Sequence, residues 1–391
     1  MKHFSAQYIF TNEGPPLKRG IVSVKSDGTI AAVEDSGGNL SERESAEFHN
    51  GIIIPGLVNC HCHLELSHMK GRSAPGSGLA EFLKNFRTKR ENGNETMLFS
   101  AAEADREMYS GGVMLCADIC NTRMTFDIKK KSRIKYISLL EVFGLEPEKA
   151  GRRMDEVLQL ADIARDYNLP FSIVPHAAYS ISLTLFRFLK EATANNRITS
   201  LHFMETEAEK SFLKYYDGPL MESYRESELL PENKEIVSDH AEAVLEEVTP
   251  SGNLILVHNT FVDRTTIKKV RKRENLYWCL CPRANMYIED HVPPVDLLTE
   301  EGCRIVIGTD SLASNDSLDI LAELKVLQAH FPEIPLAELV RWATFNGAAA
   351  LRQENTYGSI RRGKKPGLLL LQDIDLQNMR LLPESRVRRL A

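Results

Sequence analysis

The segment Pro55-Gly56-Leu57-Val58-Asn59-Cys60-His61-Cys62-His63 places two histidines at the end of an apolar run that begins at Ile52. An apolar run that ends in polar side chains is typical of the carboxyl end of a buried β-strand. Side chains alternate between the two faces of a strand, so His61 and His63 are predicted to point one way, and Cys60 and Cys62 the other. Two imidazoles on one face are half of a four-ligand metal site.

Seven further apolar segments follow this one and alternate with amphipathic, helix-like stretches. They are residues 113–118, 134–140, 171–174, 199–202, 253–258, 276–280 and 304–308. With residues 52–58 they make eight strands, and apolar strands that alternate with helices indicate a parallel sheet covered by helices. The sequence therefore predicts an α/β fold, a (β/α)8 TIM-like barrel with its active site at the carboxyl ends of the strands.

The two ends of the chain have a different character, with short strand-like runs broken by glycine and proline turns. We expect residues 1–54 plus 357–391 to form one small β-sandwich domain, and residues 55–356 to form the barrel. Residues 205–250 are predicted to be an acidic, helical excursion from the barrel.

Polar residues that can bind a metal follow several of the predicted strands. His61 and His63 follow the first strand, His202 ends the fifth and Asp310 follows the eighth. Three imidazoles and one carboxylate suit one divalent ion, with zinc expected first and iron as the alternative. Such an ion lowers the pKa of a water molecule towards neutrality, and Asp310 could accept a proton from that water.

Two further strand ends carry candidates for acid–base catalysis. Glu205 lies three residues beyond His202 and could carry protons between a water molecule and a substrate ring, whereas Glu207 and Glu209 are expected to cap the next helix. His258 ends the sixth strand and could act on the water or on the leaving group, the alternative being a structural histidine.

His176 follows the fourth predicted strand and is the candidate for a substrate contact. Its alternative is a loop histidine that hydrogen-bonds its own backbone. Ser180, four residues later, is predicted to cap the helix that follows.

Composition excludes several classes of protein. The chain has 391 residues, 43% hydrophobic and 26% charged, with a net charge of −6 and a pI near 6.1, which argues against a nucleic-acid-binding protein. The basic run at residues 129–133 is expected to be a solvated loop or helix face. No apolar stretch approaches the roughly 20 residues of a membrane helix. Seven cysteines without a regular framework favour reduced thiols and a cytoplasmic protein.

Taken jointly, the motifs of the chain resemble those of a known superfamily. They are Pro55–His63, His176-Ala177-Ala178-Tyr179-Ser180, His202-Phe203-Met204-Glu205-Thr206, Val257-His258-Asn259-Thr260 and Gly308-Thr309-Asp310-Ser311. The chain is similar to the amidohydrolase superfamily, in its branch of aromatic-amine deaminases and chlorohydrolases. The resemblance implies the barrel with a small sandwich domain and a single metal ion.

The resemblance also implies a role for each candidate residue. By it, His61, His63, His202 and Asp310 are the metal ligands, Glu205 is the proton carrier, His258 is the second acid or base, and His176 approaches a nucleoside-like substrate. Ala178 stands where the family motif usually has proline, and Lys365-Pro366-Gly367 replaces the usual Ala-Asp near the end of the chain.

Within the superfamily, the segment His63-Leu64-Glu65-Leu66-Ser67 together with Glu141-Val142-Phe143-Gly144 most resembles the aminodeoxyfutalosine deaminases. Other adenine-nucleoside deaminases, including those acting on S-adenosylhomocysteine, remain alternatives. We therefore expect a hydrolase that releases ammonia from an amino-substituted heteroaromatic small molecule.

Two other functions stay open on the sequence alone. One is a chlorohydrolase or amide hydrolase with the same metal site, and the other is a barrel without catalytic activity. The residues proposed to line the pocket are Phe82, Phe86, Arg87, Glu141, Ser314 and Asn315. The oligomeric state is also open, although barrels of this size often form homodimers.

Overall fold

The computed structural model describes residues 1–39, 46–89, 93–229, 248 and 250–391. Most of the strands lie in two parallel sheets. The first has the order β6 (Leu57–Cys62), β7 (Val113–Cys120), β8 (Lys135–Val142), β9 (Phe171–Pro175). The second has the order β10 (Ile198–Phe203), β11 (Asn253–His258), β12 (Leu276–Leu280), β13 (Ile305–Ile307). All seven of the later predicted strands overlap one of these, so the α/β class of the fold is confirmed.

The two parallel sheets also meet at their ends. A parallel bridge joins Ala177, just after β9, to His202 in β10, and another joins Cys62 in β6 to Asp310, just after β13. In the first junction the backbone N–H of His202 donates to the carbonyl of His176 at 2.8 Å, and in the second that of Thr309 donates to the carbonyl of His61 at 2.9 Å. Both junctions lie beside predicted site residues.

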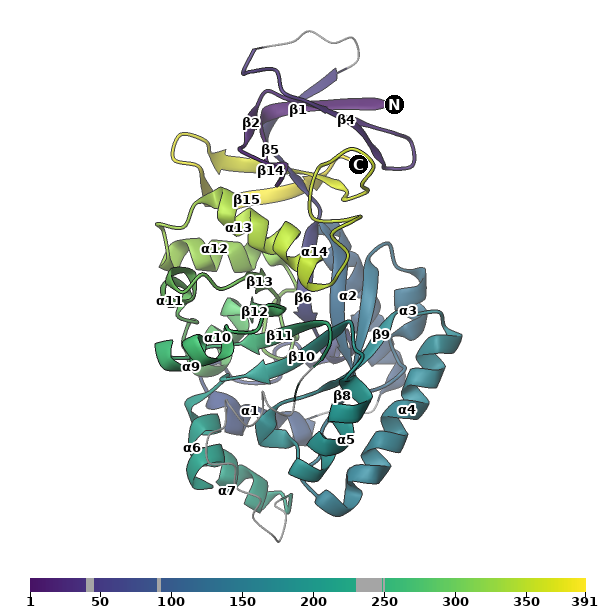
Figure 1. The fold of residues 1–391 in the computed structure, drawn as a ribbon, viewed down its shortest axis with the longest axis vertical. Helices are drawn as coiled ribbons and strands as arrows, with labels where there is room; N and C mark the ends of the chain where they lie inside the picture. Colours follow the sequence, from purple (N-terminus) through teal and green to yellow (C-terminus); the bar gives the residue numbers. More distant parts are fainter. Residues whose placement is uncertain (40–45, 90–92, 230–247, 249) are drawn as a thin grey trace.

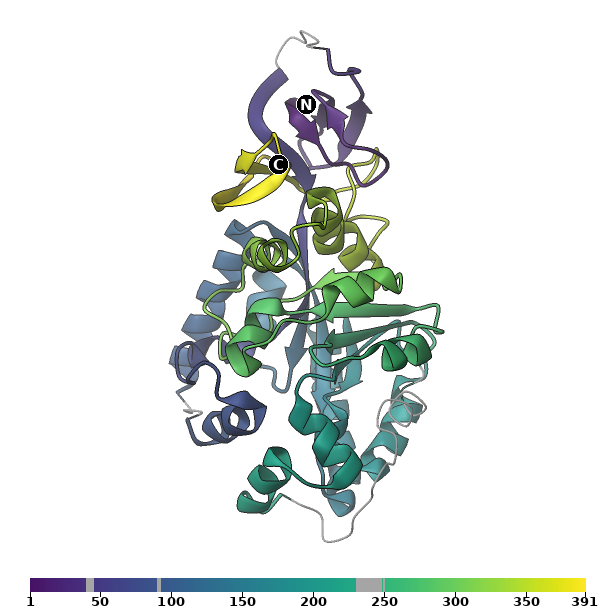
Figure 2. The same cartoon turned by 90° about the vertical axis from the view of Figure 1, so that its left-hand side faces the viewer.

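Helices surround the parallel sheets (Figure 1, Figure 2). The α-helices are α1 (Gly78–Lys89), α2 (Asn94–Ser110), α3 (Phe126–Lys131), α4 (Ala150–Asp166), α5 (Leu183–Thr193), α6 (Glu207–Tyr215), α7 (Pro219–Glu226), α9 (Arg264–Val270), α10 (Pro282–Glu289), α11 (Val295–Glu300), α12 (Ile320–His330), α13 (Leu336–Arg341) and α14 (Gly347–Ala350). Shorter turns are the 3-10 helices η1 (Leu64–Met69), η2 (Pro147–Lys149) and η3 (Ala178–Ser180), and the π-helix η4 (Trp342–Asn346). Within the described residues, no helix is long and apolar enough to cross a membrane. The predicted acidic excursion contains α6 and α7, and residues 230–247 and 249 lie outside the described residues.

Strands from both ends of the chain form one mixed seven-stranded sheet at one pole of the molecule (Figure 1). It contains β1 (Lys2–Ile9), β2 (Leu17–Lys18), β3 (Ile21–Val24), β4 (Ile30–Glu34), β5 (Ala46–Pro55), β14 (Leu368–Asp375) and β15 (Arg380–Arg389). β14 pairs antiparallel with β5, and β5 pairs parallel with β1. An apolar cluster of its own, which includes Phe4, Ile53 and Leu370, packs on this sheet.

The first predicted strand, residues 52–58, is divided in the structure. β5 ends at Pro55 and belongs to the terminal sheet, whereas β6 begins at Leu57 and belongs to a parallel sheet. Gly56 lies between them, where an added Cβ would come within 2.2 Å of Met114 Cγ and 2.4 Å of the Pro366 carbonyl oxygen. The apolar run therefore contributes one strand to each of two sheets. Glycine is required between them because a side chain at residue 56 would clash with its neighbours.

The prediction that Cys60 and Cys62 share a face is wrong. Cys60 packs in the apolar cluster that joins the facing surfaces of the two parallel sheets, and Cys62 packs in the cluster between sheets and helices. The register between β6 and β7 shifts between Asn59 and Cys62, so the alternation of faces is interrupted there. Such a bulge re-aims side chains beside it.

The prediction of a solvated face for residues 129–133 is wrong for Lys129. Its side chain is fully buried, and Nζ lies 2.5 Å from Oδ2 of Asp118, which is also fully buried. Its neighbour Lys130 is exposed, as predicted.

Candidate metal centre and active site

The side chains of His61, His63, His202 and Asp310 meet at the carboxyl ends of strands. His61 lies in β6, His63 one residue beyond it, His202 in β10, and Asp310 just after β13. All four are buried, with exposed fractions of 8% or less. The structure thus brings together the four residues that the sequence predicts to be metal ligands.

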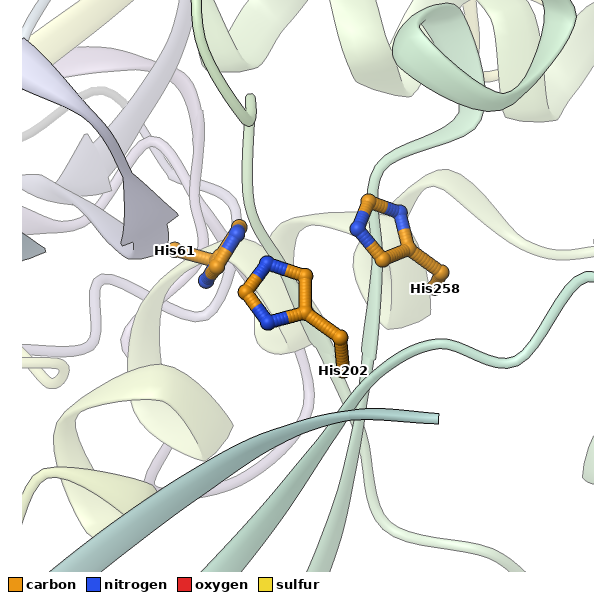
Figure 3. A group of neighbouring side chains, drawn as sticks. All are labelled: His61, His202 and His258. Atoms are coloured by element: carbon orange, nitrogen blue, oxygen red, sulfur yellow. The ribbon is translucent and has the colours of Figure 1, made fainter. Parts of the chain in front are cut away.

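The distances among these groups are short. Nε2 of His63 lies 3.1 Å from Nε2 of His61. Oδ1 of Asp310 lies 3.5 Å from Nε2 of His61 and 3.3 Å from Nε2 of His63. The ring of His202 is edge-on to that of His61, with centroids 4.8 Å apart. Figure 3 shows that the rings of His61, His202 and His258 come from three separate segments and converge. Ligand atoms of His61, His63 and Asp310 lie within 4.8 Å of one another, as do those of His61, His202 and His258.

The charge states of these groups fit a cation. Burial, and then the neighbouring His61, lowers the pKa of His63 to about 3. Burial and the surrounding histidines hold the pKa of His202 well below its ordinary value. Burial alone would raise the pKa of Asp310, but its hydrogen bond with His61 and the nearby imidazoles outweigh burial and lower it. Neutral imidazoles and an ionised carboxylate are the forms that bind metals.

Neighbouring groups orient these side chains. Nδ1 of His202 lies 2.9 Å from the carbonyl oxygen of His176, which can only accept, so the proton of His202 is on Nδ1 and its lone pair is on Nε2. Ser314 donates its hydroxyl hydrogen to Oδ2 of Asp310. Nδ1 of His61 is buried without a hydrogen-bond partner among the described residues. Two facing imidazole nitrogens, the free Nε2 of His202 and the carboxylate of Asp310 are groups that could hold a metal ion.

Glu205 lies in the loop between β10 and α6, and its side chain is buried. Burial, followed by the charges of Asp310 and Glu209, raises the pKa of Glu205 well above its ordinary value. Tyr179 donates to Oε2 of Glu205 at 3.0 Å, and Nε2 of His258 lies 3.5 Å from Oε1. A buried carboxyl with a raised pKa beside a cavity is suited to donate and accept protons.

His258 is the last residue of β11, and its ring is held from both sides. Nδ1 lies 3.3 Å from the side-chain amide of Asn285 on α10, while Nε2 faces Glu205. Burial is the largest cause that lowers the pKa of His258, to about 3, with His61 and His63 adding to it. The ring is therefore neutral at ordinary pH and can exchange a proton with Glu205.

Three strand ends at the site have left-handed backbone conformations. The φ angles are 51° at Met204, 74° at His258 and 58° at Asp310. Residues other than glycine rarely adopt such angles, and they are found at sites where the surrounding structure holds a side chain in place. These turns direct Glu205, His258 and Asp310 towards the same cavity.

His176 follows β9 and lines the cavity, with its ring 4.5 Å from that of His202. Burial and the neighbouring histidines lower the pKa of His176 to about 3. Its Nδ1 lies 2.7 Å from Oγ of Ser180. The prediction that Ser180 caps the following helix is wrong, because Ser182 is the cap of α5 and accepts the backbone N–H of Leu185.

The prediction that Glu207 and Glu209 cap α6 is wrong, because the cap is Thr206, whose side chain accepts the backbone N–H of Ala208. Glu209 lies in the first turn of α6 and binds the chain before the helix. Its carboxylate accepts the backbone N–H groups of Met204 at 3.3 Å and of Glu205 at 2.9 Å. Glu207 is exposed. Glu209 therefore holds the backbone of Glu205, and Glu207 does not take part in the site.

A cavity of about 430 Å³ opens beside these residues. Its lining includes Phe82 and Glu141, which the sequence analysis proposed, but neither Ser314 nor Asn315, which lie buried behind Asp310. The side chains of Phe86 and Arg87 lie outside the described residues. The lining residues that sequence reasoning missed are Leu66, Leu79, Leu83, Asn121, Phe143, Gly144, Leu145, Glu146, Arg153, Tyr179, Ser180, Tyr224, Leu229, Ile288 and Ser311. Six of them lie inside motifs quoted from the sequence, and that was the only signal that could have found them: Leu66, Phe143, Gly144, Tyr179, Ser180 and Ser311.

Comparison with known proteins agrees with this geometry. Residues 52–385 match the amidohydrolase family. An adenosine deaminase of Helicobacter pylori is 26% identical over 82% of this chain and 79% of its own length. A 5-methylthioadenosine/S-adenosylhomocysteine deaminase of Thermococcus kodakarensis is 26% identical over 77% of this chain and 70% of its own. A 5'-deoxyadenosine deaminase of Methanosarcina acetivorans is 25% identical over 94% of this chain and 82% of its own.

Solved structures share the fold. Aminofutalosine deaminase of Helicobacter pylori, in complex with methylthio-coformycin, superposes with a TM-score of 0.78 at 22% identity, over 95% of this chain and 92% of its own. An atrazine chlorohydrolase of Arthrobacter aurescens, complexed with zinc, gives a TM-score of 0.73 at 17% identity, over 97% of this chain and 90% of its own.

Proposed function

Because this chain belongs to the amidohydrolase family, we propose that it is a metal-dependent deaminase of adenine-nucleoside-like molecules. The observation that carries the proposal is the convergence of His61, His63, His202 and Asp310 beside the buried carboxyl of Glu205, at the wall of one cavity. The relatives named above act on adenosine, S-adenosylhomocysteine and 5'-deoxyadenosine. Aminodeoxyfutalosine stays a candidate substrate, and the structural neighbour that deaminates aminofutalosine supports it.

In this proposal, His61, His63, His202 and Asp310 hold one divalent ion, zinc in the first instance. When bound, such an ion would supply Lewis acidity, which lowers the pKa of a water molecule towards neutrality. The neutral imidazoles and the ionised Asp310 described above are the protonation states that this assignment requires.

The residues of the chain then move protons. Glu205 transfers a proton to the ring nitrogen next to the amine-bearing carbon, and that carbon becomes tetrahedral as water adds to it. Of the two protons of the water, one passes through Asp310 and His258 to the amino group, which leaves as ammonia, and the other restores the carboxyl of Glu205, while the ring carbon keeps the oxygen. Tyr179 holds Oε2 of Glu205, so that the carboxyl points into the cavity. The overall reaction converts the amino group of the ring and one water molecule into a ring carbonyl group and ammonia.

We also propose that the two parallel sheets form one (β/α)8 barrel. The bridges Ala177–His202 and Cys62–Asp310 support closure at both junctions, and a single apolar cluster joins the facing sides of the two sheets. The division into a barrel of residues 55–356 and a β-sandwich of residues 1–54 plus 357–391 is part of the same proposal. The sheet shared by the two termini, with its own apolar cluster, supports it.

The cellular setting is proposed as cytoplasmic, and all seven cysteines are free, as expected for a reducing compartment. A homodimer stays a prediction, which light scattering of the purified chain would test.

The test of the function is an ammonia-release screen with zinc-loaded enzyme. The panel contains adenosine, 5'-deoxyadenosine, S-adenosylhomocysteine, aminodeoxyfutalosine, guanine and a pterin, with chloride release from a chlorotriazine measured in parallel. We expect ammonia from at least one adenine nucleoside. Chloride release alone would show a chlorohydrolase instead, and neither product in the presence of stoichiometric zinc would contradict the proposal.

Glu205→Gln tests the role of the proton carrier. We expect this variant to keep its zinc and to lose at least about 100-fold in kcat, because proton transfer by a positioned group contributes roughly 100- to 10,000-fold. Glu207→Gln is the matched control, since Glu207 is exposed and two residues away, and should turn over like the wild type. Full activity in Glu205→Gln would remove Glu205 from the mechanism.

A further inference from the structure

The end of β8 presents a carboxyl group that the proposed mechanism does not use. Ile137 and Leu139 of β8 belong to the apolar cluster between the facing sides of the two sheets, and Leu140 belongs to the outer cluster. By alternation, Glu141 therefore points to the inner side, one step beyond Leu139 towards the carboxyl end. It lines the cavity together with Asn121 and His176, which follow the two neighbouring strands.

One oxygen of this carboxyl is held and the other is not. The side-chain amide of Asn121 donates to Oε2 of Glu141 at 3.1 Å. Oε1 is buried and has no hydrogen-bond partner among the described residues, and the side chain is only 3% exposed. Nδ1 of His202 lies 3.8 Å from Oε1, but its hydrogen is directed to the carbonyl of His176 at 2.9 Å. A buried carboxyl oxygen without a partner is unfavourable unless a ligand supplies a donor.

The other groups of the cavity do not supply that donor. Among the described lining residues, Arg153 is the only lysine or arginine, and it pairs with Glu156 at 3.1 Å and lies over the ring of Phe143 at 5.9 Å. The imidazole of His176 has Nδ1 directed at Ser180. An additional cation is also disfavoured, because Nδ1 of His202 carries a hydrogen and cannot be its ligand. What remains is a donor on the substrate.

The substrate can supply one at this place. The groups that act on the amine-bearing ring carbon lie at the ends of β10, β11, β13 and β6, so the part of the substrate beyond the ring extends over β7, β8 and β9. The polar side chains that line the cavity there include Asn121, Glu141, His176 and Ser180. In an adenine nucleoside, the part attached to the ring is a sugar whose hydroxyl groups are hydrogen-bond donors.

We propose that Glu141, oriented by Asn121, accepts a hydrogen bond from a sugar hydroxyl of the substrate and so selects nucleosides that carry this hydroxyl. This inference rests on the proposed function and adds a specificity residue to it. Oε2 stays with Asn121, Oε1 takes the hydroxyl hydrogen, and no bond is made or broken.

The test compares substrates that differ only in one hydroxyl. For adenosine, 2'-deoxyadenosine and 3'-deoxyadenosine, kcat/KM is measured for the zinc-loaded wild type and for Glu141→Met. We expect the wild type to disfavour one deoxy substrate by roughly 10- to 100-fold, the range for leaving a buried hydrogen-bonding group without its partner. In Glu141→Met this ratio should fall to within about threefold, while zinc content stays stoichiometric. Glu148→Met, which changes an exposed acid on the surface, is the control and should keep the wild-type ratio.

The outcomes separate the two proposals. A wild type that releases no ammonia from any nucleoside contradicts the proposed function itself. A wild type that deaminates all three substrates within threefold of each other overturns the role of Glu141 and leaves the proposed function standing, as does an unchanged ratio in Glu141→Met. If Glu141→Met does not fold or does not hold zinc, Asn121→Leu is measured in its place. Releasing Glu141 should lower the ratio at least threefold, and an unchanged ratio would again overturn the inference.

Discussion

The buried ion pair between Lys129 and Asp118 leads to a quantitative prediction. Both side chains are fully buried, with Nζ 2.5 Å from Oδ2 of Asp118, 2.7 Å from Sγ of Cys120 and 3.3 Å from Oγ of Ser138. Burial alone would lower the pKa of Lys129, but the charge of Asp118 outweighs it and raises the pKa, so the lysine is charged. The other oxygen of Asp118 accepts the backbone N–H of Leu64 at 2.7 Å, immediately after His63.

Replacing Lys129 by methionine keeps most of its volume and removes the partner of a buried carboxylate. Removing one partner of a buried pair destabilises a protein by about 3–5 kcal/mol. At about 2.1 cal/mol/K per residue, 391 residues have an unfolding entropy of about 0.8 kcal/mol/K. We therefore expect Lys129→Met to lower Tm by about 4–6 °C.

The assay is thermal unfolding of the metal-free chain, followed by circular dichroism and by calorimetry. Lys130→Met is the matched control, because Lys130 is the next residue on α3, is exposed, and only lies over the ring of Tyr167 at 5.5 Å. It should lower Tm by no more than about 1 °C. Adding Asp118→Asn to Lys129→Met removes the unpaired charge but keeps an acceptor for Leu64, and should recover part of the loss. Equal Tm values for Lys129→Met and Lys130→Met would refute the reasoning.

Two further predictions concern the cavity. Tyr179→Phe removes the donor to Oε2 of Glu205 and should lower kcat about 10-fold without loss of zinc, which a metal assay and steady-state kinetics would check; unchanged kcat would contradict the orienting role. For His176, the unfolded chain takes up a proton below pH 6.5 but the folded chain only near pH 3, so stability falls as the pH drops between these values. At pH 5 protonation of His176 in the unfolded chain should lower the free energy of unfolding by about 2 kcal/mol. Between pH 7 and pH 5, the Tm of the metal-free His176→Gln variant should therefore fall by about 2 °C less than the Tm of the metal-free wild type. An equal fall in Tm would contradict the low pKa of His176.

Most of the site could be predicted from the sequence because its residues lie at strand ends. His61, His202, His258 and Asp310 each close an apolar run, and parallel strands in an α/β fold bring their carboxyl ends to the same side. Such a prediction needs only the limits of the strands, which apolar runs mark well. The distances between the side chains did not need to be known.

The burial of Lys129 could not be predicted in the same way. Its neighbours in sequence are two more lysines and it begins no apolar run, so the local pattern indicates a solvated helix face. What buries it is a carboxylate on the preceding strand and the rings of Phe126 and Tyr136, at 5.8 and 5.7 Å from Nζ. The decisive partner is set by how α3 packs on β7, which periodicity does not reveal. The unpartnered oxygen of Glu141 could not be predicted either, because its surroundings are formed by residues that follow three neighbouring strands.

The register shift in β6 shows where simple alternation stops being sufficient. A regular strand would put Cys60 and Cys62 on one face, but the extra residue between Asn59 and Cys62 sends their side chains into different clusters. His61 and His63 nevertheless both reach Asp310, at 3.5 and 3.3 Å. Left-handed conformations at Met204, His258 and Asp310 likewise interrupt the regular backbone at the three other strand ends. A metal site needs side chains from several strands to be directed at one point. The regular alternation of side chains along a strand does not by itself produce that arrangement. The departures from regular geometry therefore concentrate where the polar groups converge, which is why sequence patterns identify these residues more easily than they predict the directions of their side chains.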